Sequence, residues 1–160
     1  MKKGLLLLIV AIFLAACATV KVRQRVTDPV DREYLASVWT DSLEFVLPDG
    51  DLAELAWYRA QVFVARFGAP IAHSYSYSIS TLNPRFYTSV GSVASIAYTV
   101  TRLKEGNKVY FAIAAYAFGD TYADRLNSRM LSRYMRTGQL RAHLLNRDFD
   151  IGSIINPSTP

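Results

Sequence analysis

Hydrophobic and polar residues alternate with different periods along the chain, and each period predicts a kind of secondary structure. Residues 52–67 carry apolar side chains every three or four positions, which predicts an amphipathic helix with one core-facing stripe. Asp51 and Glu54 form a capping-box pattern at its start, and Gly68 predicts its end. The stripe consists of Leu52, Ala53, Ala56, Trp57, Ala60, Phe63, Val64 and Phe67.

Residues 71–118 follow period two, which predicts antiparallel strands. Phe86–Leu103 predicts a long strand with a bend at Gly91, Lys104–Asn107 predicts a hairpin loop, and Val109–Phe118 predicts a central strand that is apolar on both faces. The stretch before them, residues 73–80, alternates larger side chains with serines. We expect its tyrosines to form cross-strand core pairs rather than a sugar-stacking platform. The larger residues are His73, Tyr75, Tyr77 and Ile79, and the serines are Ser74, Ser76, Ser78 and Ser80.

Two further elements precede the first long helix. Asp28 followed by Pro29 predicts the start of a short helix that runs to about Ser37. Its apolar side is expected to hold Val30, Tyr34 and Val38. Residues 43–47 alternate and predict a brief strand.

Helical periodicity returns after the strands. Thr121 and Asp124 form a capping-box pattern at the start of a last long helix, and Gly138 interrupts or ends it. Its apolar face consists of Ala123, Leu126, Met130, Leu131 and Tyr134. Strands joined by hairpins and flanked by helices predict an α+β fold, a two-layer sandwich in which an antiparallel sheet of three to four strands carries two long helices on one face. We expect one globular domain over residues 28–150, followed by a frayed tail over 151–160.

The N-terminus has the composition of an export signal. Lys2 and Lys3 precede a run of small and apolar residues from Gly4 to Ala16, which is too short to span a bilayer. The run closes on Leu14-Ala15-Ala16-Cys17, which resembles the lipobox of bacterial lipoproteins.

The lipobox resemblance implies a signal peptide over residues 1–16, cleavage before Cys17 and lipid (palmitate-type acyl) modification of its thiol. Residues 17–27 then form the lipidated cysteine and a basic tether. Ala18 stands where retained inner-membrane lipoproteins often carry Asp, so the resemblance implies the outer membrane, facing the periplasm, with surface exposure left open. The alternative is that Ala16-Cys17-Ala18 is an ordinary A-x-A cleavage pattern.

Composition excludes several classes of site. Cys17 is the only cysteine, so intramolecular disulfides and cysteine-based zinc sites are excluded. The formal net charge of +5 falls to +3 when Lys2 and Lys3 leave with the signal, which is below the excess typical of nucleic-acid binders. No nucleophile-elbow, zincin, P-loop or dinucleotide motif occurs, so we expect no catalysis, no cofactor and no metal, although hydrolase activity stays open.

Arginines on the last helix are the sharpest candidate binding feature. They occupy an arc of about 80° beside the apolar face, without interleaved acids. They are Arg125, Arg129, Arg133 and Arg136. Four guanidinium groups suit phosphates of lipopolysaccharide or phospholipid, or an acidic protein surface, and the alternative is a solvated helix face. As a contact surface they predict that changing Arg129 and Arg133 together to Glu abolishes function with little loss of stability.

The order of elements loosely resembles that of small outer-membrane assembly and transport accessory lipoproteins. This resemblance implies a lipid-anchored, non-catalytic accessory or structural subunit of an envelope complex, with the membrane and an envelope protein as partners. The alternative is a stand-alone binding module for an anionic glycolipid or a cell-wall glycan. It would use the arginines or the serine-rich face of residues 74–80, with Ser89, Ser95, Thr99 and Thr101.

Overall fold

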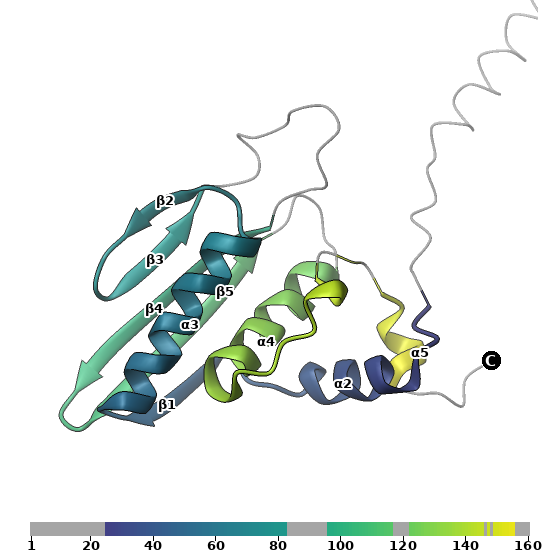
Figure 1. Ribbon diagram of the computed structural model, residues 1–160, viewed down its shortest axis with the longest axis horizontal. Helices are drawn as coiled ribbons and strands as arrows, with labels where there is room; N and C mark the ends of the chain where they lie inside the picture. The colour runs from purple at the N-terminus through teal and green to yellow at the C-terminus, as the bar shows by residue number, and fades with distance from the viewer. Residues whose placement is uncertain (1–24, 83–95, 117–121, 146, 148, 156–160) are drawn as a thin grey trace, which may run out of the picture.

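The computed structural model describes residues 25–82, 96–116, 122–145, 147 and 149–155. In this part of the chain a five-stranded antiparallel sheet carries helices on one face (Figure 1). The α+β prediction with an antiparallel sheet is confirmed, and the expected three to four strands are corrected to five. In chain order the elements are α2 (Pro29–Trp39), β1 (Glu44–Pro48), α3 (Asp51–Phe67), β2 (Ile71–Ser74), β3 (Ser78–Thr81), β4 (Ala97–Glu105), β5 (Lys108–Tyr116), α4 (Tyr122–Thr137), a 3-10 turn (Ala142–Leu144) and α5 (Ile151–Ile155).

The strand order is β1-β5-β4-β3-β2, so β4 and β5 form the centre of the sheet. These two strands are paired over their full lengths, from Ala97 opposite Tyr116 to Glu105 opposite Lys108. Gly106 makes the turn between them possible because its φ of 59° is costly for residues with a Cβ. The predicted hairpin therefore forms where Gly106 and Asn107 stand.

The core lies between the sheet and the helices. Alternate residues of the strands point toward α3 and α4, while their neighbours point to the other face. The buried hydrophobic strand residues are Ile79, Tyr98, Val100, Val109, Phe111 and Ile113. The Asn127 amide on α4 donates to the Tyr98 hydroxyl at 3.0 Å, so one of the deepest polar groups of the core is satisfied across the layers.

The two long helices follow their predicted stripes with two changes. On α3 the stripe is buried, except that Leu52 is exposed and Phe67 is half-buried. Gly50, with φ 133°, is the N-cap of α3 and no side chain caps it, so the predicted capping box at Asp51 and Glu54 is wrong. On α4, buried residues extend beyond the predicted face to Asn127, Ser128, Ser132 and Met135, because this helix packs against α3, β5 and α2 at once.

The short helix α2 begins where the sequence predicts. The Asp28 carboxylate accepts hydrogen bonds from the amides of Val30 (2.7 Å) and Asp31 (3.3 Å), which satisfies two of the unpaired donors at the helix start. The predicted apolar side is wrong in part: Val30 is exposed, and Leu35 with Val38 faces the core.

The predicted single strand over residues 73–80 is a hairpin, and this adds the extra strand. The amide of Tyr75 donates to the Ser78 carbonyl at 2.7 Å, and β2 and β3 pair on either side of this turn. The sequence does not reveal this reversal of the chain, because the alternation continues through it and no Gly or Pro marks the turn. Tyr75 and Tyr77 consequently lie exposed at the hairpin end, and the expectation that they form core pairs is wrong.

The ends of the domain extend past the predicted boundaries. Val26, three residues before the start of α2, packs in the core cluster. At the other end α5 buries Ile151 and Ile154, so the domain continues to Ile155 instead of fraying from residue 151. The predictions for residues 1–24, the bend at Gly91 and the cap at Thr121 lie outside the described residues.

Candidate functional site: the open face of the sheet

Among the described residues, the sheet face opposite α3 and α4 has no helix packed on it (Figure 1). The register of the strands sets three rows of side chains across this face. The first row is Val46, Tyr110 and Leu103; the second is Glu44, Ala112, Thr101 and Ser78; the third is Ala114, Thr99 and Ser80. The first row is apolar, whereas the other two are small and mostly polar.

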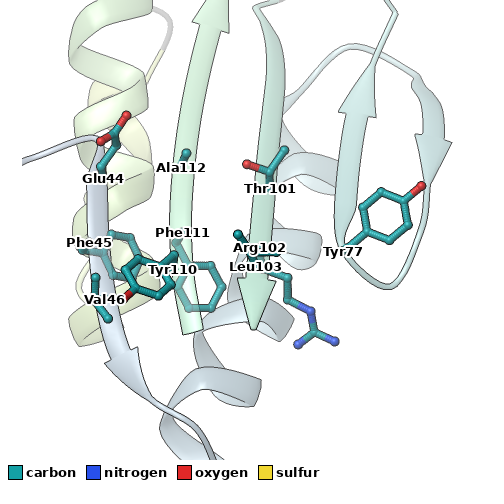
Figure 2. Close-up of a pocket in the computed structure, with 10 residues that line it drawn as sticks. All are labelled: Glu44, Phe45, Val46, Tyr77, Thr101, Arg102, Leu103, Tyr110, Phe111 and Ala112. Carbon is teal, nitrogen blue, oxygen red and sulfur yellow. The ribbon is translucent and has the colours of Figure 1, made fainter. Parts of the chain in front are cut away.

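Exposure of the apolar row is the unusual feature of this face. Leu103 is 65% exposed, Val46 47% and Tyr110 37%. Figure 2 shows these side chains with Tyr77 from the neighbouring hairpin, around a shallow hollow of about 420 Å³. A contiguous group of exposed apolar residues on a rigid sheet is typical of an interaction surface, whereas scattered single residues are not.

Arg102 fixes the hairpin that borders the hollow. Its backbone amide donates to the Tyr77 carbonyl at 2.8 Å, and its Nε donates to the Ser76 carbonyl at 2.5 Å. The same guanidinium pairs with Glu54 on α3 at 2.8 Å and lies 4.9 Å from the centre of the Trp57 ring. One side chain thereby joins the hairpin, the central strand and α3, so the border of the hollow is held in place.

The exposed hairpin tyrosines stack on each other. The rings of Tyr75 and Tyr77 are 5.5 Å apart and tilted by 7°, and the His73 ring lies 6.1 Å from that of Tyr75. Stacking limits the rotamers of these rings before any partner arrives. Tyrosine in such a setting offers a large contact area with little conformational entropy to lose.

The predicted arginine stripe lies at the seam between α4 and α2. Arg133 and Arg136 both pair with Asp41, at 2.6 Å and 2.5 Å. The Asp41 side chain is only 11% exposed and that of Arg133 only 18%. Arg133 also hydrogen-bonds the Ser37 hydroxyl. Two of the four arginines therefore hold the chain after α2 against α4.

The other two arginines lie further toward the start of α4. The Arg129 guanidinium stacks 4.9 Å from the Trp39 ring centre, and its Nε is buried without a hydrogen-bond partner. Arg125 is exposed and its carbonyl accepts from Arg129 at 3.2 Å. Binding of an anion by the four arginines remains a prediction, with Arg133 and Arg136 already neutralising a carboxylate inside the protein.

A second clamp lies at the far side of α2. The nearly buried Asp31 accepts from Arg141 at 2.6 Å and lies 2.8 Å from Nε2 of His143. Hydrogen bonding from His143, followed by that from Arg141, holds the pKa of Asp31 below its usual value, although burial acts in the opposite direction. The clamp ties the segment after α4 to α2.

Cys17 lies outside the described residues. Three acidic residues between α2 and α3 or on α3 form ion pairs: Asp41 with Arg133 of α4, Asp49 with Lys104, and Glu54 with Arg102. Within the described ranges no group of three potential ligands for a metal ion occurs, and no helix is long and apolar enough to cross a membrane.

Comparison with known proteins gave no match: no family model, no curated protein and no solved structure is significantly similar to this chain. The surface described above was not singled out from the sequence. The sequence did carry a signal for it. Leu103 lies three residues before the Gly106–Asn107 turn and Tyr110 three residues after it, so the two apolar residues pair across the hairpin, next to the charged pair of Glu105 and Lys108. Their common face became evident only with the register of β1 and β3.

Proposed function

We propose that the protein is a lipid-anchored, non-catalytic subunit of a bacterial cell-envelope complex, and that it docks through the open face of the sheet. The observation that carries the docking is the exposed row of Val46, Tyr110 and Leu103, bordered by Tyr77. Protein interfaces favour tyrosine and aliphatic residues with few charges at their centre. The central rows of this face contain one charged residue, Glu44, at the edge.

Anchoring through Cys17 supports this function because it confines the domain to the membrane surface. Seven residues lie between Cys17 and Arg25, the first described residue, so the two are eight residue steps and at most about 28 Å apart when the chain is extended. A partner must then lie at or near the same membrane. The lipoprotein resemblance implies three acyl chains on the mature N-terminus, which exceeds the two signals that stable anchoring requires.

Replacement of Cys17 by Ser tests the anchoring. The variant is expected to lose processing at the lipobox and to leave the membrane fraction after cell breakage. Normal processing together with full membrane retention would contradict a lipoprotein. Normal processing with both the wild-type protein and the variant in the soluble fraction would instead support ordinary cleavage at Ala16-Cys17-Ala18, which leaves no lipid anchor.

Affinity capture in mild detergent tests docking. The full-length lipidated protein is expected to retain a specific protein partner in stoichiometric amount, and to show no retention on lipopolysaccharide or peptidoglycan. Retention on either glycan without any protein would instead favour the stand-alone binding module.

A further inference from the structure

The rows of the open face point to their own occupant. We propose that a second copy of this chain packs on it face to face, related by a two-fold axis that runs along the seam between β4 and β5. This inference rests on the proposed docking role of the face and names the partner. Its basis is the register of the two central strands, their charges and the area of the sheet.

The two-fold axis along the seam places each outward residue of β5 over its cross-strand neighbour in the other copy. Lys108 then faces Glu105, and Tyr110 faces Leu103. Further along, small residues face small residues, as Ala112 meets Thr101 and Ala114 meets Thr99. Opposite charges meet at one end and apolar groups meet beside them, so the face is complementary to itself.

Charge also selects this axis over the other in-plane two-fold. An axis across the strands through the row of Ala112 and Thr101 would bring Glu44 of one copy onto Glu44 of the other. The axis along the seam places Glu44 over Ser78 instead, because β1 and β3 lie on opposite sides of the central pair. Of these two axes, only the one along the seam keeps the two Glu44 side chains apart.

The size of the sheet fits a weak dimer. With about 3.4 Å per residue and 4.8 Å between strands, the five strands present a face of about 500 Å². Because β2 has no strand opposite it about this axis, two such faces would bury at most about 900 Å², which is at the low end for specific association. Attachment of both copies to one membrane raises their effective concentration, so a weak interface suffices there.

Cysteine crosslinking in membranes tests the proposed dimer in the full-length protein. One tagged chain carries Thr101→Cys and a differently tagged chain carries Ala112→Cys. Thr101 and Ala112 are also neighbours within one chain, so placing the two cysteines on separate chains ensures that any disulfide between them joins two copies. Mild oxidation is expected to give a mixed disulfide dimer at several times the yield of a Thr101→Cys pair. Chains carrying Leu52→Cys on the exposed side of α3, and chains with only Cys17, supply the background.

Charge exchange provides a second measurement that does not depend on thiols. Lys108→Glu places like charges together at two symmetric positions, and we expect it to weaken dimerisation on the order of tenfold. Glu105→Lys in the same chain should restore it. Both residues are exposed at the hairpin turn, so the variants are expected to fold normally.

The outcomes separate this inference from the docking function. A mixed disulfide at background yield, or equal yields for the mixed and the Thr101→Cys pairs, would overturn the proposed dimer. If the protein is then found to capture a different envelope protein through Leu103, the docking function stands with another partner. If neither a second copy nor another protein depends on Leu103, both proposals are wrong.

Discussion

The seam between α2 and α4 differs from the open face of the sheet in how its side chains are satisfied. Charged side chains at the seam are paired within the molecule, whereas apolar side chains on the open face are exposed to solvent. The seam is rich in charge, yet Arg133 and Arg136 are paired with Asp41 inside the molecule. The sheet face has few charges, yet it exposes its apolar row to solvent. On α4 the run of charge thus lies beside the core, and the Asp41 partner of Arg133 and Arg136 comes from a distant part of the chain.

The largest predicted effect breaks the seam. Arg133→Glu would place a carboxylate against Asp41 and leave that nearly buried acid with Arg136 alone, so we expect a loss of about 3 kcal/mol in the free energy of unfolding. Urea denaturation of the full-length protein in detergent measures it. This expectation differs from the small loss of stability predicted from the sequence for the Arg129 and Arg133 double variant, because the Arg133–Asp41 ion pair was not foreseen there.

Arg125→Glu is the matched control for this prediction, since Arg125 lies on the same helix and is exposed. Its effect is expected to be below about 1 kcal/mol. Equal stability of the Arg133→Glu and Arg125→Glu variants would contradict the role given to the seam.

A smaller effect concerns the second clamp on α2. The pKa of Asp31 is lowered in the folded protein, so its charge stabilises the fold above the usual carboxyl pKa of about 3.9 and this contribution is lost as the pH falls through the folded value. Asp31→Asn is expected to cost about 1 kcal/mol at pH 7.

Thermal melting at several pH values checks the Asp31 prediction. The difference between the wild-type protein and Asp31→Asn should be larger at about pH 5 than at about pH 3 and should shrink as the pH falls below about 4. A difference that does not change with pH would show that the charge of Asp31 contributes nothing.

Local signals predicted much of the fold. Asp28 and Pro29 start α2, the apolar stripe defines α3, and Gly106 marks the central hairpin, because each depends on residues close in sequence. The site was not predictable in the same way. Arg133 and Asp41 are 92 residues apart, and the hairpin at Tyr75 has neither Gly nor Pro to mark it.

The alignment of the open face depends on strand order, which alternation alone does not define. Val46 joins Tyr110 and Leu103 only because β1 pairs with β5, although four elements separate them in the chain. The sequence shows which side chains share a face of one strand, and the register shows which strands bring those faces together.

The smallest predicted effect on stability belongs to the sheet face. Leu103→Lys alters a side chain that is already exposed and is expected to change the free energy of unfolding by less than about 0.5 kcal/mol. Chemical denaturation beside the wild-type protein measures it. A loss comparable with that of Arg133→Glu would mean that Leu103 belongs to the core of the fold.

Affinity capture in mild detergent tests docking through the open face most directly. It compares how much partner, a second copy included, is retained by the Leu103→Lys and the Leu52→Lys variants. Both leucines are about equally exposed, but Leu103 lies on the open face and Leu52 on α3. We predict that Leu103→Lys loses nearly all of its captured partner while Leu52→Lys retains it, with both proteins equally stable. Equal capture by the two variants, or loss only in Leu52→Lys, would contradict docking through the sheet.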